Sequence, residues 1–281
     1  MKLFTKSFGK GDFLRKVANN SNKQEKLTPE LKNILEELYL RYDNPDFIEA
    51  DPISIPHSFD NQLDREISGF LAATIAWGNR KAIVKSAHRM MDYLDGRPYE
   101  FVVGASEREL SALGSYVHRT FNGTDLECFV RALRRICVGH GSLGEWFEEA
   151  WERTGDMRMV LADFRKEFFA IDHLTRSEKH LSSISKGAAC KRLNMYLRWM
   201  VREDRHGVDF GYWKRIPSSA LYLPLDLHSG NMARELGLLE RKQNDWKAVE
   251  EVMTHLREAD PNDPVKYDYA LFGVGINNGL K

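Results

Sequence analysis

Residues 191–202 read Lys-Arg-Leu-Asn-Met-Tyr-Leu-Arg-Trp-Met-Val-Arg, and their pattern decides the fold class. The apolar side chains recur three and four residues apart, at Leu193, Tyr196, Leu197, Met200 and Val201. This period predicts an amphipathic α-helix, with polar and basic residues such as Arg198 on its other side. Small residues at 187–189 precede the helix, so the backbone there can approach a ligand closely.

Helical patterns of the same kind extend along the chain in both directions. Thr28-Pro29-Glu30 combines a cap residue, a proline at the first helical position and an acid in the first turn. A long helical segment begins near Asp60, is interrupted at Trp77-Gly78-Asn79 and then resumes. Residues 175–178, Thr-Arg-Ser-Glu, fit a capping box that opens a short helix. Because alternating strand patterns are nearly absent, we predict an all-α protein.

The composition is that of an ordinary globular protein. The chain has 281 residues, of which 42% are hydrophobic and 29% charged, and this excludes a fibre or a disordered tail. The apolar run at 70–77 is far too short to cross a bilayer, and residues 1–16 hold no apolar core of signal-peptide length. We therefore expect a cytoplasmic protein without a membrane partner.

The cysteines exclude several cofactor classes. Cys128, Cys137 and Cys190 are an odd and widely spaced set. They cannot form a disulfide framework, a four-cysteine zinc site or a four-cysteine iron–sulfur cluster, so we expect small buried side chains and no cofactor.

Charge is balanced overall but uneven along the chain. Lys and Arg number 41, as do Asp and Glu, which argues against a protein wrapped in nucleic acid on all sides. Residues 1–26 hold seven basic and two acidic residues, and residues 176–215 hold ten and four. We expect 1–26 to form a basic N-terminal arm, and either stretch could meet phosphate or be a solvated face.

Lys191 is the first candidate for chemistry. It lies near the start of the predicted helix, where free N–H groups attract anions. Arg192 beside it and Arg198 two turns on favour the neutral amine, which is the nucleophilic form of lysine. A solvent-exposed lysine on a polar helix face is the alternative that the pattern alone leaves open.

Two carboxylates are the next candidates. Asp226, within Pro-Leu-Asp-Leu-His at 224–228, reads as the N-cap of a helix, where it is either a cap alone or a catalytic carboxylate held in one geometry. Asp226 and His228 lack a third ligand nearby, so no metal site is predicted. Asp268 and Phe272 share a helix face and could hydrogen-bond and stack a base, or form a partly exposed surface.

Two helix starts carry a resemblance to a known family. Lys-Arg-Leu-Asn at 191–194, followed after a loop by residues 224–228, is similar to helix starts in the helix-hairpin-helix DNA glycosylase superfamily, which includes endonuclease III. Residues 27–281 also resemble a bacterial family of conserved hypothetical proteins of unknown function, remotely akin to the archaeal 8-oxoguanine DNA glycosylase. The segments that carry this resemblance are 51–53, 71–78, 190–202 and 263–268.

The resemblance implies a fold and a set of roles. The fold would be a helix-hairpin-helix glycosylase-like domain over 27–281, with two helical halves and a cleft between them. Lys191 would attack the sugar C1′ and form a Schiff base, and Asp226 would assist that attack and stabilise positive charge on the sugar. Trp77, Asp268 and Phe272 would stack and read the extruded base.

The resemblance also implies contacts to the nucleic-acid backbone. The residues expected to make them are Lys186, Gly187, Arg192, Arg198, Lys214 and Arg215. The chain departs from the superfamily in its hairpin, because residues 185–190 hold one glycine where a Leu-Pro-Gly-Val-Gly pattern is usual. A C-terminal cysteine cluster is also missing from the sequence, which excludes the iron–sulfur version of the family.

The expected function follows from these roles. It is removal of an oxidised purine such as 8-oxoguanine from damaged duplex DNA by a monomer, followed by strand cleavage through the Schiff base. A catalytically silent nucleic-acid-binding module on the same scaffold is a first alternative. A related enzyme that acts on RNA or free nucleosides is a second one.

Overall fold

The computed structural model describes residues 27–277, so the predicted basic arm at 1–26 lies outside the described residues. Within the described part the protein is mostly helical, with 66% of residues in helices. The exception is one short antiparallel hairpin, in which β1 (Val117–His118) pairs with β2 (Phe121–Asn122). The prediction of a helical protein is confirmed at this level, whereas the glycosylase-like arrangement stays a prediction.

The helices follow one another with short connections. In chain order they are α2 (Pro29–Tyr42), α3 (Asp46–Glu49), α4 (Ser54–His57), α5 (Gln62–Thr74), α6 (Arg80–Tyr93), α7 (Pro98–Gly104), α8 (Glu107–Ala112), η1 (Leu113–Ser115), α9 (Gly123–His140), α10 (Leu143–Thr154), α11 (Met157–Phe168), η2 (Thr175–His180), η3 (Ile184–Lys186), α12 (Lys191–Val201), η4 (Ser218–Ala220), α13 (Leu227–Glu235), α14 (Trp246–Ala259), η5 (Pro264–Lys266) and α15 (Tyr267–Asn277). The η elements are short 3₁₀-helices of three or six residues.

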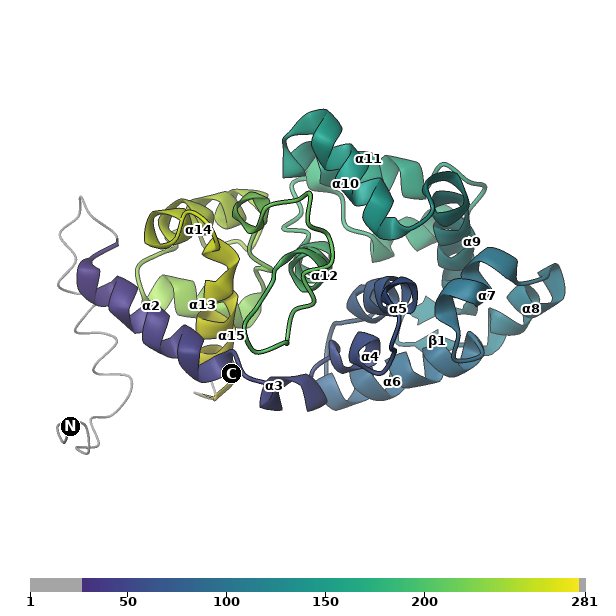
Figure 1. Cartoon of the computed structure of the whole chain (residues 1–281), viewed down its shortest axis with the longest axis horizontal. Coiled ribbons are helices and arrows are strands. Elements are labelled where there is room, and N and C mark those ends of the chain that lie inside the picture. The colour runs from purple at the N-terminus through teal and green to yellow at the C-terminus, as the bar shows by residue number, and fades with distance from the viewer. Residues whose placement is uncertain (1–26, 278–281) are drawn as a thin grey trace.

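The helices gather in two groups, with α12 between them (Figure 1). One group brings both ends of the described chain together, because α15 packs against α2 and α13. The other group is continuous in sequence from α4 to α11, and within it α5 packs on α4 and α9 packs on α7 and α10. The chain therefore leaves the first group after α2 and returns to it with α13.

Helix α12 joins the two groups because both of its sides are buried. Its apolar side packs on α5, where the Tyr196 hydroxyl donates to the Glu66 carbonyl at 3.0 Å. Its polar side is also buried, and Arg198 and Arg202 meet carboxylates there. The predicted helix is confirmed, but its polar side is not a solvent-exposed face, because Arg198 and Arg202 are paired with carboxylates inside the protein.

A cluster of aromatic rings forms the core of the second group. Phe70 on α5 contacts the rings of Phe129, Phe164 and Phe168, with centroids 5.5–6.2 Å apart. Such edge and offset contacts add about 0.5–1.5 kcal/mol per pair to the free energy of burial. This packing fixes α5 and therefore also the loop after it, which holds Trp77.

Most predicted helix starts are confirmed, and one is wrong. Thr28 and Asp226 cap α2 and α13 with their side chains, as their sequences predict. The capping box at Thr175 does not form, since η2 is a 3₁₀-helix without a side-chain cap. Glu178 instead accepts a hydrogen bond from Arg165 at 2.8 Å, a tertiary contact that outweighs the local cap.

Two further features concern the environment of the protein. None of the helices in residues 27–277 combines the length and apolar character needed to cross a bilayer. Cys128, Cys137 and Cys190 are each buried and free, as expected from their spacing. Burial raises the pKa of the Cys190 thiol to about 12 and that of Cys128 to about 11, so both stay in the protonated, unreactive form.

Candidate functional site

A pocket of about 1330 Å³ opens where the two groups of helices meet. Its walls come from α3, α6, the start of α12, the start of α13 and α15. The five residues with predicted catalytic or base-binding roles all line this pocket: Trp77, Lys191, Asp226, Asp268 and Phe272. The structure therefore brings together side chains that are up to 195 positions apart in the sequence.

Three helices begin at this pocket. Arg80, Lys191 and Leu227 are the first residues of α6, α12 and α13, and all three line it. The first turn of a helix carries unsatisfied N–H groups and a partial positive charge of roughly half a unit. The start of α13 is capped by the Asp226 carboxylate and that of α6 by the Asn79 side chain, whereas α12 has no side-chain cap, so of the three it is the start of α12 that can attract a ligand with negative charge.

Lys191 is placed by an unusual start of α12. Gly187 and Cys190 adopt positive φ angles of 78° and 50°, so the chain turns sharply before the helix. No side chain caps α12, and its first turn holds no acidic residue. Lys191 is half-buried, and no described residue gives it a hydrogen bond or a close ion pair, so its amine is available to a ligand.

A short segment before α14 ties the starts of α12 and α13 together. Asn244 donates from its amide to the Asp226 carbonyl at 2.7 Å, and Trp246 donates from its backbone N–H to the Gly187 carbonyl at 2.9 Å. A Cβ at Gly230 would lie 2.7 Å from Asn244 Oδ1, so only glycine leaves room for this amide. This third segment therefore fixes the positions of Lys191 and Asp226 relative to each other.

Asp226 acts as a helix cap with one carboxylate oxygen. Its Oδ1 accepts hydrogen bonds from the backbone N–H groups of His228 at 2.8 Å and Ser229 at 3.0 Å. The backbone N–H of Asp226 donates to the Ser229 hydroxyl, which completes a capping box. No described residue provides a hydrogen bond to Oδ2, so the second oxygen can face a ligand while the first fixes the side chain.

Asp268 lies deeper and is held by Arg198. The two side chains form a buried ion pair, and Arg198 also contacts Asp209 at 3.3 Å. The pKa of Asp268 is raised to about 6, chiefly by burial and also by the charge of Asp226, against the lowering effect of Arg198 and Lys191. The carboxyl can therefore take up or give a proton near neutral pH. These influences also show that Lys191, Asp226 and Asp268 act on one another electrostatically.

The two aromatic residues of the predicted base pocket have close neighbours. The Trp77 ring has the Arg192 guanidinium 5.1 Å from its centroid and the His180 ring stacked at 6.0 Å. The Phe272 ring has the Arg80 guanidinium at 5.2 Å. Both rings therefore have another side chain against them.

Arg192 and Arg198 are committed to the protein rather than to solvent. Arg192 donates to the Thr74 carbonyl, and burial lowers the pKa of its guanidinium to about 10, which still leaves it charged at neutral pH. Arg198 is buried beneath the pocket and paired with two carboxylates. The structure gives both arginines a positioning role at the site.

The other residues predicted to contact the nucleic-acid backbone lie outside the pocket lining. Lys186 and Gly187 are exposed on the turn before α12. Lys214 pairs with Glu203 at 2.5 Å, and Arg215 makes ion pairs with Glu145, Glu148 and Glu152. The charge of Arg215 is therefore already compensated, and neither residue is brought to Lys191.

Sequence reasoning missed three polar residues of the pocket. Asp51 and Arg80 face each other at 4.0 Å, and burial raises the pKa of the Asp51 carboxyl while Arg80 lowers it. Asn244 supports Asp226 from a segment 18 residues further along the chain. The Asp51-Pro52 and Trp77-Gly78-Asn79 segments marked two of these places, but nothing in the sequence pairs them.

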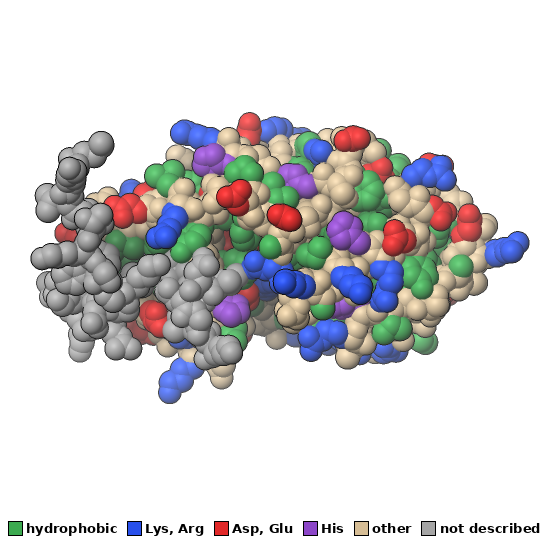
Figure 2. All heavy atoms as spheres, turned by 90° about the horizontal axis from the view of Figure 1, so that it is seen from below, with side chains coloured by type: hydrophobic (Ala, Val, Ile, Leu, Met, Phe, Trp, Pro, Cys, Tyr) green, Lys and Arg blue, Asp and Glu red, His purple; other side chains and the backbone are tan. Residues whose placement is uncertain are grey.

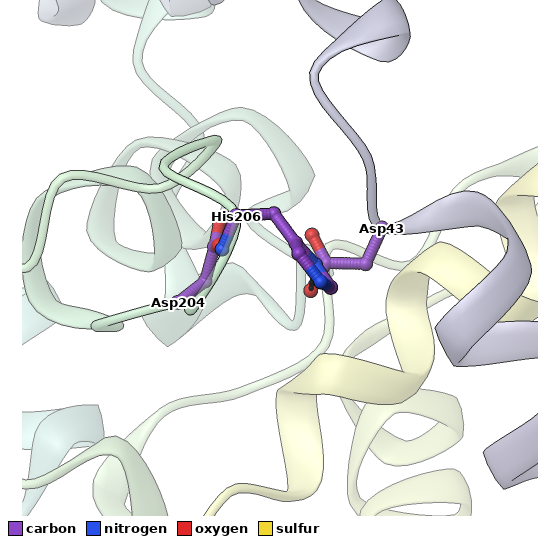
Figure 3. Close-up of side chains that lie close together, drawn as sticks. All are labelled: Asp43, Asp204 and His206. Atoms are coloured by element: carbon purple, nitrogen blue, oxygen red, sulfur yellow. Dashed lines mark hydrogen bonds and ion pairs between the residues drawn. The ribbon is translucent and has the colours of Figure 1, made fainter.

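Asp43, Asp204 and His206 form a second group of polar side chains (Figure 3). Asp204 already accepts hydrogen bonds from four backbone N–H groups, those of residues 206–209. Arg202 lies 3.6 Å from Asp43 and 3.9 Å from Asp204. A guanidinium therefore occupies the place where a cation would bind, and the group serves to hold the loop after α12 against α2.

Comparison with known proteins identifies the family. No curated protein and no solved structure matches the chain. Residues 51–277, which include every residue of the pocket discussed above, match the family described as "Protein of unknown function (DUF2400)". The chain belongs to this DUF2400 family.

Proposed function

We propose that the protein removes a damaged base from DNA and cleaves the strand through a Schiff base at Lys191. The observation that carries the proposal is the meeting of Lys191 and Asp226 in one pocket, each at the start of a different helix. An amine without a partner among the described residues, in the same pocket as an anchored carboxylate, is the pair that such chemistry requires.

The proposed reaction uses these two side chains in turn. The Lys191 Nζ attacks C1′ of the deoxyribose, the bond from C1′ to the base breaks, and the base leaves with a proton. Asp226 stabilises the positive charge that develops on the sugar, accepts the proton that the amine loses and gives this proton to the departing base. Opening of the sugar ring gives the Schiff base, and β-elimination then breaks the C3′–O bond.

The rest of the pocket supports a nucleotide as substrate. A volume of about 1330 Å³ accommodates an extruded nucleotide, and Trp77 and Phe272 offer aromatic edges or faces to its base. Asp268, with its pKa near 6, can accept or donate a hydrogen bond at the base edge. The uncapped start of α12 at the pocket favours a phosphate group of the strand over an uncharged nucleoside.

Borohydride trapping tests the proposal. The protein is incubated with duplexes that carry 8-oxoguanine, uracil or an abasic site, and borohydride reduces any Schiff base to a stable crosslink. We expect a crosslink with the abasic site and with the substrate lesion, and its loss in Lys191→Gln. The matched control is Lys247→Gln, which removes an exposed lysine outside the pocket lining. Absence of a crosslink on every duplex, or an unchanged yield in Lys191→Gln, would contradict the proposal.

One observation favours a second candidate, a module that binds nucleic acid without turnover. Arg80 lies against the Phe272 ring, and Arg192 and His180 lie against the Trp77 ring, so both aromatic platforms are partly occupied. A base would then have to displace a guanidinium in order to stack. Binding of oligonucleotides without a crosslink on any lesion would favour this candidate.

A further inference from the structure

Helix α6 presents a basic side to the pocket. Lys81, Lys85 and His88 are exposed and line it, and their spacing of four and three residues places them on one side of the helix. The rise of 1.5 Å per residue spreads the three side chains over about 10 Å along the helix axis. Figure 2 shows Lys and Arg side chains gathered on the face of the molecule that α6 forms.

The stability of α6 does not explain why Lys81 and Lys85 occupy these positions. No described residue forms a hydrogen bond or an ion pair with Lys81 or Lys85, unlike Arg80, which faces Asp51. The first turn of α6 holds no acidic residue, so Arg80 and Lys81 lie at the positive end of the helix dipole. A cation in that position destabilises a helix by about 0.3–1 kcal/mol. Helix stability therefore does not account for the charge of Lys81, which is available to a ligand.

The acidic residues that line the pocket do not neutralise the positive charge of α6. Glu49, Asp51, Asp226 and Asp268 also line the pocket. Asp51 and Asp268 face arginines, which neutralise them. The charges that α6 itself presents to the pocket without a partner among the described residues are therefore cationic.

The turn before α12 cannot bind phosphate with its backbone as a glycine-rich hairpin would. The N–H groups of Lys186 and Ala188 both donate to the Ser183 carbonyl, at 3.2 Å each, and the N–H of Gly187 donates to the Ile184 carbonyl at 2.8 Å. These donors are used inside the protein. These three N–H groups are therefore not available to phosphate, and other groups must supply most contacts to a strand that enters the pocket.

We propose that the basic side of α6, formed by Lys81, Lys85 and His88, binds the phosphodiester backbone of the nucleic-acid strand whose nucleotide enters the pocket. This inference rests on the proposed function for its ligand class, and it names the surface that holds the strand. Positive side chains along one helix match the regular negative charges of a phosphodiester chain, and each contact releases counterions.

The salt dependence of binding tests this surface. Fluorescence anisotropy with an undamaged labelled duplex gives the binding constant between about 50 and 200 mM salt. In the double variant Lys81→Gln/Lys85→Gln, we expect at least about tenfold weaker binding at the low-salt end and a slope of log K against log salt smaller by about 1.5. The matched control Lys32→Gln/Lys166→Gln removes two exposed lysines outside the pocket lining and is expected to keep the wild-type slope.

Three results would overturn the inference. They are equal slopes in the two double variants, no binding of the duplex by the wild-type protein, and binding of anionic phosphatidylglycerol vesicles through these lysines with none of the duplex. The test does not depend on base removal, because the duplex is undamaged. Binding through α6 without any crosslink would remove the proposed function alone, and crosslinking with equal slopes would remove this surface alone.

Discussion

The two ends of α12 carry cations in opposite settings. At its start, Lys191 lines an open pocket, and no described residue forms a hydrogen bond or close ion pair with it. At its end, Arg202 is buried and contacts Asp209 at 3.0 Å, Asp263 at 2.9 Å and the Tyr39 hydroxyl at 2.9 Å. The guanidinium of Arg202 is thus fully engaged by neighbouring groups of the protein, whereas the amine of Lys191 is available to a ligand.

This difference separates a residue that stabilises the fold from a residue that is available for a reaction. A buried guanidinium offers fixed donors to several carboxylates, and its removal leaves those charges without compensation. A lysine at a pocket wall contributes little to stability, so its position has to be explained by a ligand. We therefore expect substitutions at the end of α12 to change folding and those at its start to change function.

The largest effect is expected for Arg202→Met. This change leaves Asp43, Asp209 and Asp263 without their shared cation, which predicts a loss of about 3–5 kcal/mol in the free energy of unfolding. Urea denaturation followed by circular dichroism measures it. Lys191→Met serves as the comparison and is expected to stay within about 0.5 kcal/mol of the wild type. Equal losses in the two variants would break the distinction between the ends of the helix.

A smaller effect, dependent on pH, is expected for Asp268. Its pKa is raised from 3.8 to about 6 in the folded protein, so the native state holds the proton more tightly than the unfolded chain. Its contribution to stability is present below about pH 4 and is lost as the pH rises through about 6, by about 3 kcal/mol. Asp268→Asn lacks this contribution, so the difference in unfolding free energy between wild type and variant should change over that window. A constant difference from pH 4 to 7 would contradict the assignment.

The smallest effect on stability is expected for Asp226, where two substitutions separate its roles. Asn is as good a cap as Asp, so Asp226→Asn should keep the free energy of unfolding within about 0.5 kcal/mol, while Asp226→Ala loses about 1 kcal/mol. Both variants remove the charge and should reduce the borohydride crosslink at least about tenfold. A normal crosslink yield in Asp226→Asn would leave this residue with a capping role only.

The sequence predicts those parts of the molecule that depend on local patterns. The period of α12, the interruption at 77–79 and the cap at Asp226 each follow from residues close together in the chain. The periodicity also shows that Arg198 lies on the polar side of its helix. It cannot show that this side is buried, because the partners lie at 209 and 268.

The remainder of the site depends on contacts between distant segments. Asn244 reaches the Asp226 carbonyl through a loop whose course no local signal predicts. The facing of Asp51 and Arg80 requires the segment after α3 to lie beside the start of α6. The predicted capping box at Thr175 is absent for the same reason, because the Glu178 carboxylate accepts a hydrogen bond from Arg165 of α11 instead.

Mapping the crosslinked residue tests the central claim most directly. The wild-type protein is trapped with borohydride on a duplex that carries an abasic site, digested with a protease and analysed by mass spectrometry. The account predicts that the sugar-derived mass lies on the peptide that contains Lys191. A stable adduct on another amine, such as Lys81 or Lys85 at the pocket wall, would contradict the assignment of Lys191 as the nucleophile.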